Sequence, residues 1–227
     1  MSQPHIAAAY SPAIQDYLKA CYRLMQSECG SVAVSQLAET LRVAPPSVTN
    51  MMKRLEGMKL VRRTSDARVQ LTKSGEAVAL EVIRHHRLLE TFLIQELGME
   101  WAEAHQEAEV LEHYISERLE HLIDQRLERP RSDPHGEPIP RKDGTIALVR
   151  HRPLLSQPIN TPLVIQQVAT QDTALLQYLQ DHDLTPGATV RIREVAPFNG
   201  PLALEVGRQC HHISREVAQC IYASVKS

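Results

Sequence analysis

Half of the prolines in this 227-residue chain lie in one short stretch, and they divide the sequence into two parts. Seven of the fourteen prolines fall within residues 130–162. Proline fixes φ, removes a backbone donor and restricts the residue before it, so no long helix can cross this stretch. We therefore predict an ordered or semi-rigid connector over residues 130–160. The sequence before the connector is helical in pattern except near residues 60–72.

Short runs typical of β-strands follow the connector. They are rich in branched apolar residues: Leu163–Val168, Thr189–Val195 and Leu202–Val206. Asn199-Gly200 is a turn signal between the last two, and Asp172 is the kind of residue that caps a helix, here one reaching Gln180. We predict a small, partly open β-barrel with one or two short helices over residues 161–227.

Composition excludes several classes of protein. Hydrophobic residues make up 43% and charged residues 23%, which is ordinary for a folded globular chain. The chain has no run of about 18 apolar residues, so no membrane-spanning helix is predicted. The first residues lack the basic and apolar stretches of a secretion signal, so we expect a cytoplasmic protein with no membrane partner. The four cysteines form no Cys-x-x-Cys pair, which argues against a zinc ribbon or a disulfide framework.

Charge is segregated along the chain. Residues 30–75 carry eight basic and three acidic side chains, a net charge of +5. Residues 76–130 carry thirteen carboxylates and five arginines, a net charge of −8, together with five of the eleven histidines. This pattern indicates two kinds of partner, a polyanion for the first segment and cations for the second. Unevenly charged, solvated helix faces are the alternative.

Three helices and a hairpin are predicted in the basic segment and just before it. The first helix begins after Ser11-Pro12, the second covers Ser35–Leu41, and Pro45 and Pro46 open the third. The first buries residues at helical spacing: Ile14, Tyr17, Leu18, Cys21, Tyr22 and Met25. The third buries Val48, Met51, Met52 and Leu55. Strands at Leu60–Thr64 and Arg68–Thr72 complete a winged helix-turn-helix.

The exposed face of the third helix has the order that a recognition helix needs. Short polar side chains stand at its start, where they reach base edges, and cations follow, where they meet phosphates. The basic hairpin suits a wing laid along a phosphate backbone. The candidate DNA-binding residues are Pro46, Ser47, Thr49, Asn50, Lys53, Arg62, Arg63 and Arg68. A three-helix bundle without a DNA partner is the alternative, but the agreement of these features favours double-stranded DNA.

Metal-ligand residue types recur in the acidic segment. His105, Glu109, Glu112 and His113 span about 100° of one helix, and His86 and Glu90 lie one turn apart on the preceding helix. Apolar residues predicted to bury these helices would place the stripe near a packing seam: Val82, Ile83, Leu89, Phe92, Leu93, Leu111, Tyr114 and Leu122. Facing carboxylates repel one another, so a cation would have to join them. A solvated polar stripe is the alternative.

The ligand types narrow the choice of metal. A mixture of carboxylate and imidazole without thiolate suits Mn(II), Fe(II), Co(II) or Zn(II), and hard oxygen donors favour manganese. The chain has no His-Glu-x-x-His motif, and nothing in it designates a small-molecule substrate, so we do not expect an enzyme. A winged-helix regulator that senses an organic ligand and a metal-dependent hydrolase are the rival interpretations.

The order of these parts resembles the diphtheria toxin repressor family of metal-dependent transcriptional regulators, and within it the manganese-transport regulators. Its most specific pieces are His86-Arg87-Leu88-Leu89-Glu90, the run from His105 to His113, and the run from Asp133 to Pro140. The resemblance implies a mainly α protein with a small β part. It assigns a DNA-binding domain to residues 1–75, a helical dimerisation and metal-binding domain to 76–148, and an SH3-like domain to 161–227. It also implies a homodimer that binds a palindromic operator and represses metal-uptake genes.

The resemblance also implies the metal ligands. The primary site falls on Asp16, Glu109, Glu112 and His113. Iron-responsive members carry methionine and cysteine at the first two positions, so the oxygen donors here resemble the manganese-responsive branch. Some of that branch has a glutamate where this chain has Lys19. The ancillary site takes one of two forms: His86, Glu90 and His105, or Glu90 with Asp133, His135 and an acid that would be Asp172.

A coupling mechanism follows from this arrangement. Asp16 belongs to the DNA-binding domain and the other primary ligands to the next domain, so a bridging metal would pin one against the other. In a dimer this would set two recognition helices about 34–36 Å apart, one turn of DNA. Without metal, we expect repulsion between the carboxylates to loosen the arrangement.

Overall fold

The computed structural model describes residues 6–27, 30–147 and 151–226, and its contacts divide the chain into two compact units. The first unit comprises Met1–His86, Glu109–Gln125 and Pro140–Thr145, and the second comprises Arg87–Ala108, Arg126–Ile139 and Ile146–Ser227. Each unit is described by itself. Residues 148–150 of the predicted connector lie outside the described residues.

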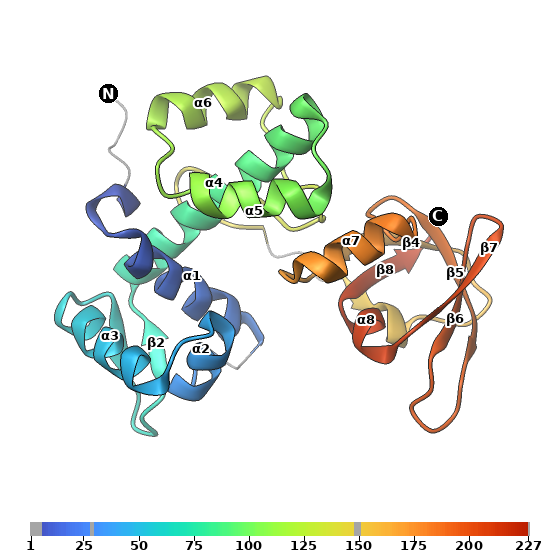
Figure 1. The fold of residues 1–227 in the computed structure, drawn as a ribbon, viewed down its shortest axis with the longest axis horizontal. Helices are drawn as coiled ribbons and strands as arrows, with labels where there is room; N and C mark the ends of the chain where they lie inside the picture. The colour runs from blue at the N-terminus through green and yellow to red at the C-terminus, as the bar shows by residue number, and fades with distance from the viewer. Residues whose placement is uncertain (1–5, 28–29, 148–150, 227) are drawn as a thin grey trace. The chain divides into compact units, whose positions relative to one another are not determined.

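The first unit begins with the predicted helix-turn-helix and hairpin (Figure 1). A 3₁₀ turn at Ala7–Ala9 precedes these elements: α1 (Pro12–Ser27), α2 (Val34–Leu41), α3 (Pro45–Gly57), β1 (Val61–Arg63) and β2 (Val69–Leu71). Pro45 stands at the start of α3, where the first N–H groups have no partner within the helix, as predicted. Most of the predicted apolar stripes of α1 and α3 are buried, although Met25 and Met51 are only half-buried.

Two backbone contacts tie the hairpin to its neighbours. Val32 exchanges hydrogen bonds of 2.8 Å in both directions with Val69, which adds a short bridge to the edge of β2. Gly75 lies against the hairpin's first strand, and a Cβ there would come within 2.0 Å of the Leu60 carbonyl oxygen. Only glycine permits this close approach, so the start of the next helix packs directly on the wing.

Three further helices carry the acidic segment: α4 (Lys73–Leu97), α5 (Trp101–Leu111) and α6 (Glu117–Arg126). Val82, Ile83, Leu89 and Leu93 are buried as predicted, and Phe92 is half-buried. The prediction is wrong for Leu111, Tyr114 and Leu122, which are 40%, 74% and 43% exposed. All three belong to the first unit, and the described residues leave each of them exposed. None of the helices in the described part of the chain has the length and apolar composition that crossing a bilayer requires.

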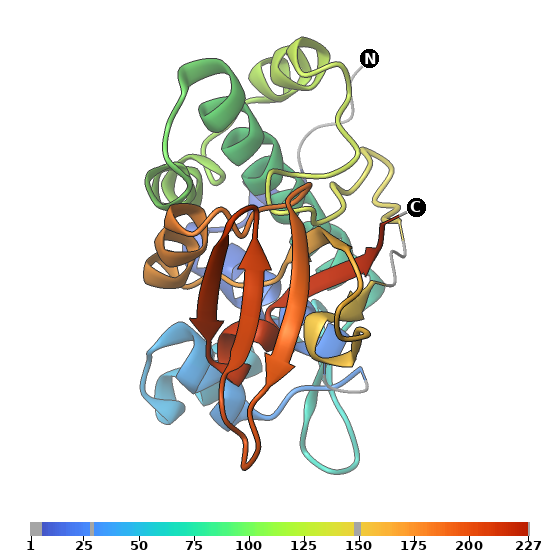
Figure 2. The same cartoon turned by 90° about the vertical axis from the view of Figure 1, so that its right-hand side faces the viewer.

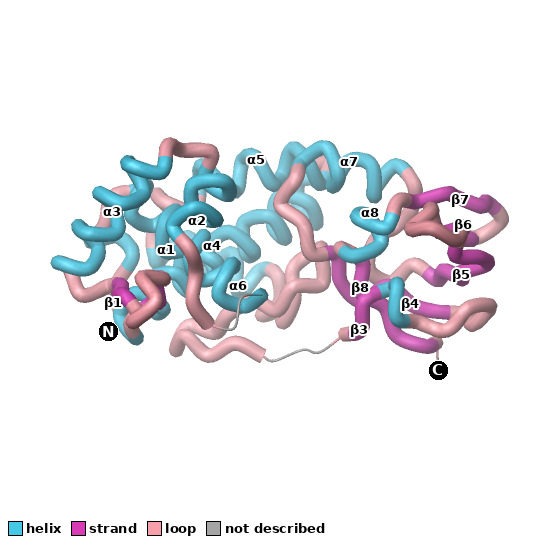
Figure 3. Tube along the Cα trace, turned by 90° about the horizontal axis from the view of Figure 1, so that it is seen from below, coloured by secondary structure: helices cyan, strands magenta, loops and turns pink. Residues whose placement is uncertain are grey.

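The second unit contains an antiparallel six-stranded sheet (Figures 2 and 3). Its strands are β3 (Arg152–Pro153), β4 (Leu163–Val168), β5 (Thr189–Val195), β6 (Leu202–Val206), β7 (Gln209–Ile213) and β8 (Ile221–Val225), in the order β3-β8-β4-β5-β6-β7. The short elements η2 (Leu154–Ser156), α7 (Thr173–Asp181) and α8 (Arg215–Gln219) accompany it. The sheet is open, as predicted, and β4, β5 and β6 coincide with the predicted runs.

One apolar cluster holds this sheet and its helices together. Alternate side chains of β4, including Leu163, Ile165 and Val168, are buried in it with residues of β5, β6 and β8. Leu179 of α7 and Ala218 of α8 close the cluster. No helix longer than the three-residue η2 occurs in the described parts of the connector, in agreement with the density of proline there.

Candidate metal centres and DNA-binding surface

Three of the predicted primary ligands converge in the first unit. Asp16 projects from α1, while Glu112 and His113 lie in the turn that follows α5 rather than on the helix itself. His113 Nε2 lies 3.2 Å from Asp16 Oδ1 and 3.7 Å from Glu112 Oε1. Each of the three residues offers a ligand atom within 4.8 Å of the others. The structure therefore gathers two carboxylates and one imidazole around a common point.

The imidazole of His113 is oriented by a buried amide that the sequence did not single out. Gln15 Nε2 donates to the carbonyl oxygens of Ala7 and Tyr10, at 2.8 and 2.9 Å. Gln15 Oε1 then faces His113 Nδ1 at 2.7 Å, and an amide oxygen can only accept. Nδ1 therefore carries a proton, and Nε2 is the ring nitrogen that faces the two carboxylates. This is the arrangement that metal-binding histidines adopt.

Glu109, the fourth predicted primary ligand, is engaged by a lysine. Lys19 Nζ lies 2.9 Å from both carboxylate oxygens of Glu109 and 2.5 Å from Glu112 Oε1. His86 Nδ1 lies 2.6 Å from Glu112 Oε2 and 3.5 Å from Glu109 Oε1. The carboxylates are thus not left facing one another uncompensated. Lys19 supplies a positive charge that offsets the repulsion between Glu109 and Glu112 in this structure.

These surroundings keep the carboxylates ionised. Burial alone would raise the pKa of Glu109, but Lys19 and His86 outweigh it and lower that pKa to about 2. Burial also opposes ionisation of Glu112, and His86 and Lys19 again lower its pKa overall. Ionised carboxylates and an imidazole whose Nε2 faces them form a ligand set that suits a divalent cation of intermediate hardness.

A second cluster of ligand types lies in the second unit. Glu90, Asp133 and His135, all buried, offer ligand atoms within 4.8 Å of one another. Glu90 Oε2 lies 3.6 Å from His135 Nδ1, and Glu90 Oε1 lies 2.7 Å from His105 Nδ1. Glu90 therefore faces His105 of one predicted form of the ancillary site and His135 of the other.

A tight turn builds this second cluster. Asp133 Oδ1 accepts from the backbone N–H groups of His135 and Glu137, each at 2.9 Å. Gly136 has φ +81°, and a Cβ there would come within 2.0 Å of the Gln166 carbonyl oxygen. Glycine thus permits both the turn and its contact with β4, where Val168 N donates to the His135 carbonyl at 2.8 Å.

Burial and neighbouring charges shift the pKa values of Asp133 and His135 in opposite directions. Burial raises the pKa of Asp133, despite Arg87 with its Nε at 3.4 Å from Oδ2. Burial would lower the pKa of His135, but Glu90 raises it overall. Within the described residues, His135 Nε2 is a buried nitrogen with no hydrogen-bond partner. Buried polar atoms nearly always have a hydrogen-bond partner, and coordination of a metal ion by this nitrogen would account for the missing hydrogen bond.

Asp172, the acid named for one form of the ancillary site, caps a helix in this structure. Its Oδ1 accepts from Leu175 N at 3.0 Å, which makes it the N-cap of α7, as its position before a helical run predicted. The carboxylate is exposed and is not among the described residues that converge with Glu90.

The predicted DNA-binding residues form two exposed groups in the first unit. Pro46, Ser47, Asn50 and Lys53 are exposed on α3, and Arg62 and Arg63 are exposed on β1. Thr49 is half-buried, and its hydroxyl donates to the Pro45 carbonyl at 3.0 Å. Arg68 differs from the others because its guanidinium donates to Ser31 Oγ at 2.9 Å and to the Ser31 carbonyl at 2.7 Å. It holds the wing to the preceding loop.

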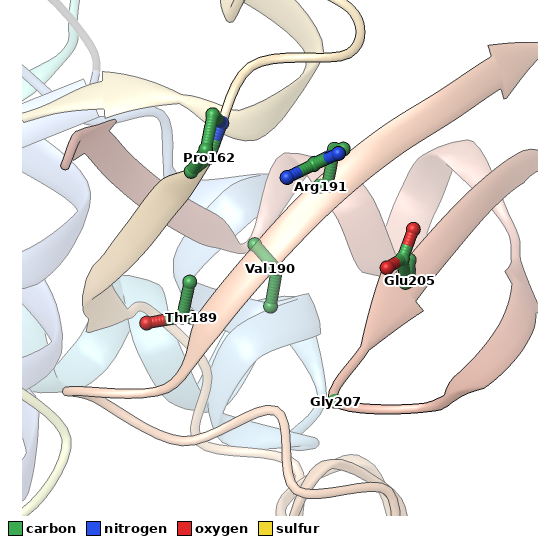
Figure 4. Close-up of a pocket in the computed structure, with 6 residues that line it drawn as sticks. All are labelled: Pro162, Thr189, Val190, Arg191, Glu205 and Gly207. Atoms are coloured by element: carbon green, nitrogen blue, oxygen red, sulfur yellow. The ribbon is translucent and has the colours of Figure 1, made fainter.

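A shallow depression on the C-terminal sheet contains none of the predicted site residues (Figure 4). It has a volume of about 230 Å³ and is lined by Pro162, Thr189, Val190, Arg191, Glu205 and Gly207. The metal-ligand types and the basic surface thus lie on other elements of the chain.

Comparison with known proteins accounts for each of these parts. Residues 10–67 match the model "Iron dependent repressor, N-terminal DNA binding domain". Residues 72–141 match "Iron dependent repressor, metal binding and dimerisation domain", and residues 152–225 match "FeoA domain". The iron-dependent repressor IdeR of Mycobacterium bovis is 30% identical over 220 residues, which cover 90% of this chain and 94% of the relative. The diphtheria toxin repressor of Corynebacterium diphtheriae is 32% identical over 127 residues, 56% of each chain.

Solved structures of similar proteins agree with this assignment. One described as a manganese-dependent transcriptional repressor in complex with manganese has a TM-score of 0.85 and 32% identity, over 94% of this chain and all of the other. ScaR with bound Cd²⁺ has a TM-score of 0.81 and 33% identity, over 94% and 99% of the two chains. The chain therefore belongs to the diphtheria toxin repressor family of metal-dependent transcriptional repressors. The winged helix-turn-helix, the helical metal-binding part and the SH3-like C-terminal part that the sequence predicted are those of this family.

Proposed function

We propose that this repressor responds to Mn(II) held at a primary site by Asp16, Glu112 and His113, with Glu109 at its edge. The convergence of Asp16 from α1 with the turn after α5 is the observation that carries the proposal. Its donors are two hard carboxylates and one imidazole, a set that suits Mn(II) better than thiolate or thioether would. Fe(II), Co(II) and Zn(II) are accepted by similar ligands, so selectivity depends on coordination geometry as well as donor type. The manganese-bound repressor of similar fold supports the same choice.

A second metal site is proposed at Glu90, Asp133 and His135. The orphaned His135 Nε2 and the convergence of three buried ligand types support it. Glu90 also faces His105 at 2.7 Å, so the ancillary form that uses His105 is the alternative. Asp172 is left out of this proposal because it caps α7.

The primary site would act on DNA binding through the packing of the helices. A bound divalent cation supplies the charge that holds two carboxylates and an imidazole around one point. Asp16 lies on α1, which packs against α2, and α2 packs against α3. Residues that hold α1 to the end of α5 therefore restrict the position of the recognition helix. Because binding is reciprocal, operator DNA must tighten metal binding by the same factor.

A homodimer is proposed through the apolar face of the first unit. Five large side chains there are between 40% and 74% exposed: Val110, Leu111, Tyr114, Leu119 and Leu122. An apolar patch on a soluble domain marks an interaction surface, and an isologous two-fold contact matches a palindromic operator. The surface lies beside the primary ligands in sequence, within the part matched by the dimerisation model.

The finer assignments complete the proposal. The proposed DNA-binding domain covers residues 1–75, and the proposed dimerisation and metal-binding domain covers residues 76–148. The SH3-like domain would cover residues 161–227. The dimer would bind double-stranded operator DNA in the cytoplasm and repress metal-uptake genes, with no enzymatic reaction and no small-molecule substrate. An organic-ligand sensor, the first rival function, would require an apolar cavity for its ligand. A metal-dependent hydrolase, the second, would require an identifiable substrate.

The test measures DNA binding as a function of metal. Double-stranded DNA is selected from a random pool with Mn(II) present, and its binding is followed by fluorescence anisotropy under anaerobic conditions. We expect Mn(II) to activate binding, chelator to abolish it, and His113→Ala to lose the Mn(II) response while it keeps weak, salt-sensitive binding through the wing. Equal binding with chelator and with Mn(II) would refute a metal-dependent repressor of this kind.

A further inference from the structure

Lys19 places a buried ammonium group beside the proposed primary ligands. The residue is only 4% exposed and follows Asp16 by one helical turn on α1. Its Nζ contacts both oxygens of Glu109 and one oxygen of Glu112. Three contacts to carboxylate oxygens satisfy all three donors of an ammonium group. The ammonium group of Lys19 is therefore held in one position inside the protein and does not extend into solvent.

One oxygen atom connects this lysine to the metal centre. Glu112 Oε1 lies 2.5 Å from Lys19 Nζ, and the same atom lies 3.7 Å from His113 Nε2. The other oxygen of Glu112 is occupied by His86 Nδ1 at 2.6 Å. The oxygen that faces the proposed metal is thus the oxygen that already accepts from Lys19.

We propose that Lys19 is an internal counter-ion that competes with the activating metal for the carboxylates of Glu109 and Glu112 and so sets the metal concentration at which the repressor switches. The inference rests on the proposed function, because it assumes that the metal binds beside His113. A divalent cation on Glu112 Oε1 either repels the ammonium that shares this oxygen or displaces it from three hydrogen bonds. Each course weakens metal binding relative to a neutral residue at position 19.

The same contacts keep the metal-free site assembled. Lys19 is on α1, and Glu109 and Glu112 are at the end of α5, so the ammonium joins the two elements that the metal would join. Metal binding then exchanges one cation for another at an existing junction. A purely structural salt bridge would also hold α1 to α5, but its removal would not tighten metal binding.

The test compares Mn(II) affinity among variants of the full-length protein, measured by the loss of the free Mn(II) signal in electron paramagnetic resonance. Lys19→Met removes the charge at similar length, and Lys19→Gln removes it while it keeps a hydrogen-bond donor. We expect Mn(II) binding to tighten by at least about tenfold in both, and to stay within about threefold of wild type in Lys19→Arg. Lys73→Met, which removes an exposed lysine, is the matched control and should bind as wild type does.

Metal-free stability gives a second readout. In chelator, Lys19→Met should melt at a lower temperature than Lys73→Met, because two buried carboxylates lose their cation, and Mn(II) should restore most of the difference. Unchanged or weaker Mn(II) binding in both Lys19→Met and Lys19→Gln would overturn the competition. If Lys19→Met does not fold, Lys19→Gln decides alone. A wild-type protein that binds no Mn(II), or binds it equally after His113→Ala, would instead refute the proposed primary site and this inference with it.

Discussion

A single amide determines which nitrogen of His113 faces the carboxylates of Asp16 and Glu112. Gln15 is 2% exposed, and its NH₂ group is committed to two backbone carbonyls, so its oxygen must face the imidazole. No sequence pattern indicates this role, because a glutamine next to an aspartate on a helix is common in proteins of many kinds. Only the backbone carbonyls of the 3₁₀ turn and the residue after it define the orientation of the amide.

Replacement of Gln15 by leucine should therefore weaken Mn(II) binding without removing a ligand. The variant leaves His113 Nδ1 without its acceptor and frees the ring to rotate or change tautomer. Loss of such a supporting contact typically costs about 10–100-fold in metal affinity. Mn(II) titration followed by electron paramagnetic resonance measures the change, with the exposed Gln26→Leu on the same helix as the control. Equal affinities in the two variants would show that the amide does not position the ligand.

At the scale of elements, α3 and the wing should contribute differently to DNA binding. Asn50 is exposed near the start of α3, where its amide is placed to read a base edge, and Arg63 is exposed on β1. Asn50→Ala should relax discrimination at one base position by about 1–3 kcal/mol. Arg63→Ala should instead weaken binding to all sequences alike and reduce the salt dependence by about one phosphate contact. Titrations of the selected DNA and its single-base variants over a range of salt concentrations separate the two effects, and a reversal of the two behaviours would contradict the proposed docking.

The elements were predictable where a local pattern determines them. Pro45 opens α3, Asp172 caps α7, and the branched runs became β4, β5 and β6 with the predicted bounds. β7 escaped prediction because its sequence, Gln209–Ile213, is polar and buries only its last residue. The Val32–Val69 bridge and the Ser31–Arg68 contact were equally hidden, since each joins residues about 37 positions apart. Pairings of this kind depend on tertiary contacts that no local pattern encodes.

The candidate site also combines features that local sequence patterns predict with features that depend on tertiary contacts. Helical spacing put His105, Glu109, Glu112 and His113 on one stripe and His86 on the preceding helix, and the structure brings ligand types together at both proposed sites. The spacing did not reveal that α5 ends before Glu112, or that Lys19 lies against the carboxylates. Nor did it reveal that Leu111, Tyr114 and Leu122 are exposed, because an apolar residue at helical spacing gives the same pattern in a core and on a surface.

At the scale of the whole molecule, the exposed apolar face should determine the oligomeric state. Leu119 and Leu122 lie on α6, which carries none of the proposed ligands, so glutamates there would place charge in the proposed interface without replacing a ligand. Light scattering of wild type should give twice the chain mass of 25.6 kDa, and the Leu119→Glu, Leu122→Glu double variant should give the mass of one chain and lose tight operator binding. Gln171→Glu adds charge at an exposed site of the C-terminal part and should leave the dimer intact. A double variant that still scatters as a dimer would place the interface elsewhere.

Coupling between metal and DNA gives the most demanding test of the mechanism. If the primary site restricts α3 through α1 and α2, Mn(II) must raise operator affinity, and operator must raise Mn(II) affinity by the same factor, since both describe one thermodynamic cycle. Couplings of this kind are typically about 5–150-fold. The first factor is measured by anisotropy with and without Mn(II), and the second by Mn(II) titration with and without operator at the same salt concentration. His113→Ala should reduce both factors to about one while wing contacts preserve weak binding. If the Mn(II) affinity is the same with and without operator, metal and DNA bind independently. The junction of α1 with the end of α5 would then have no regulatory role.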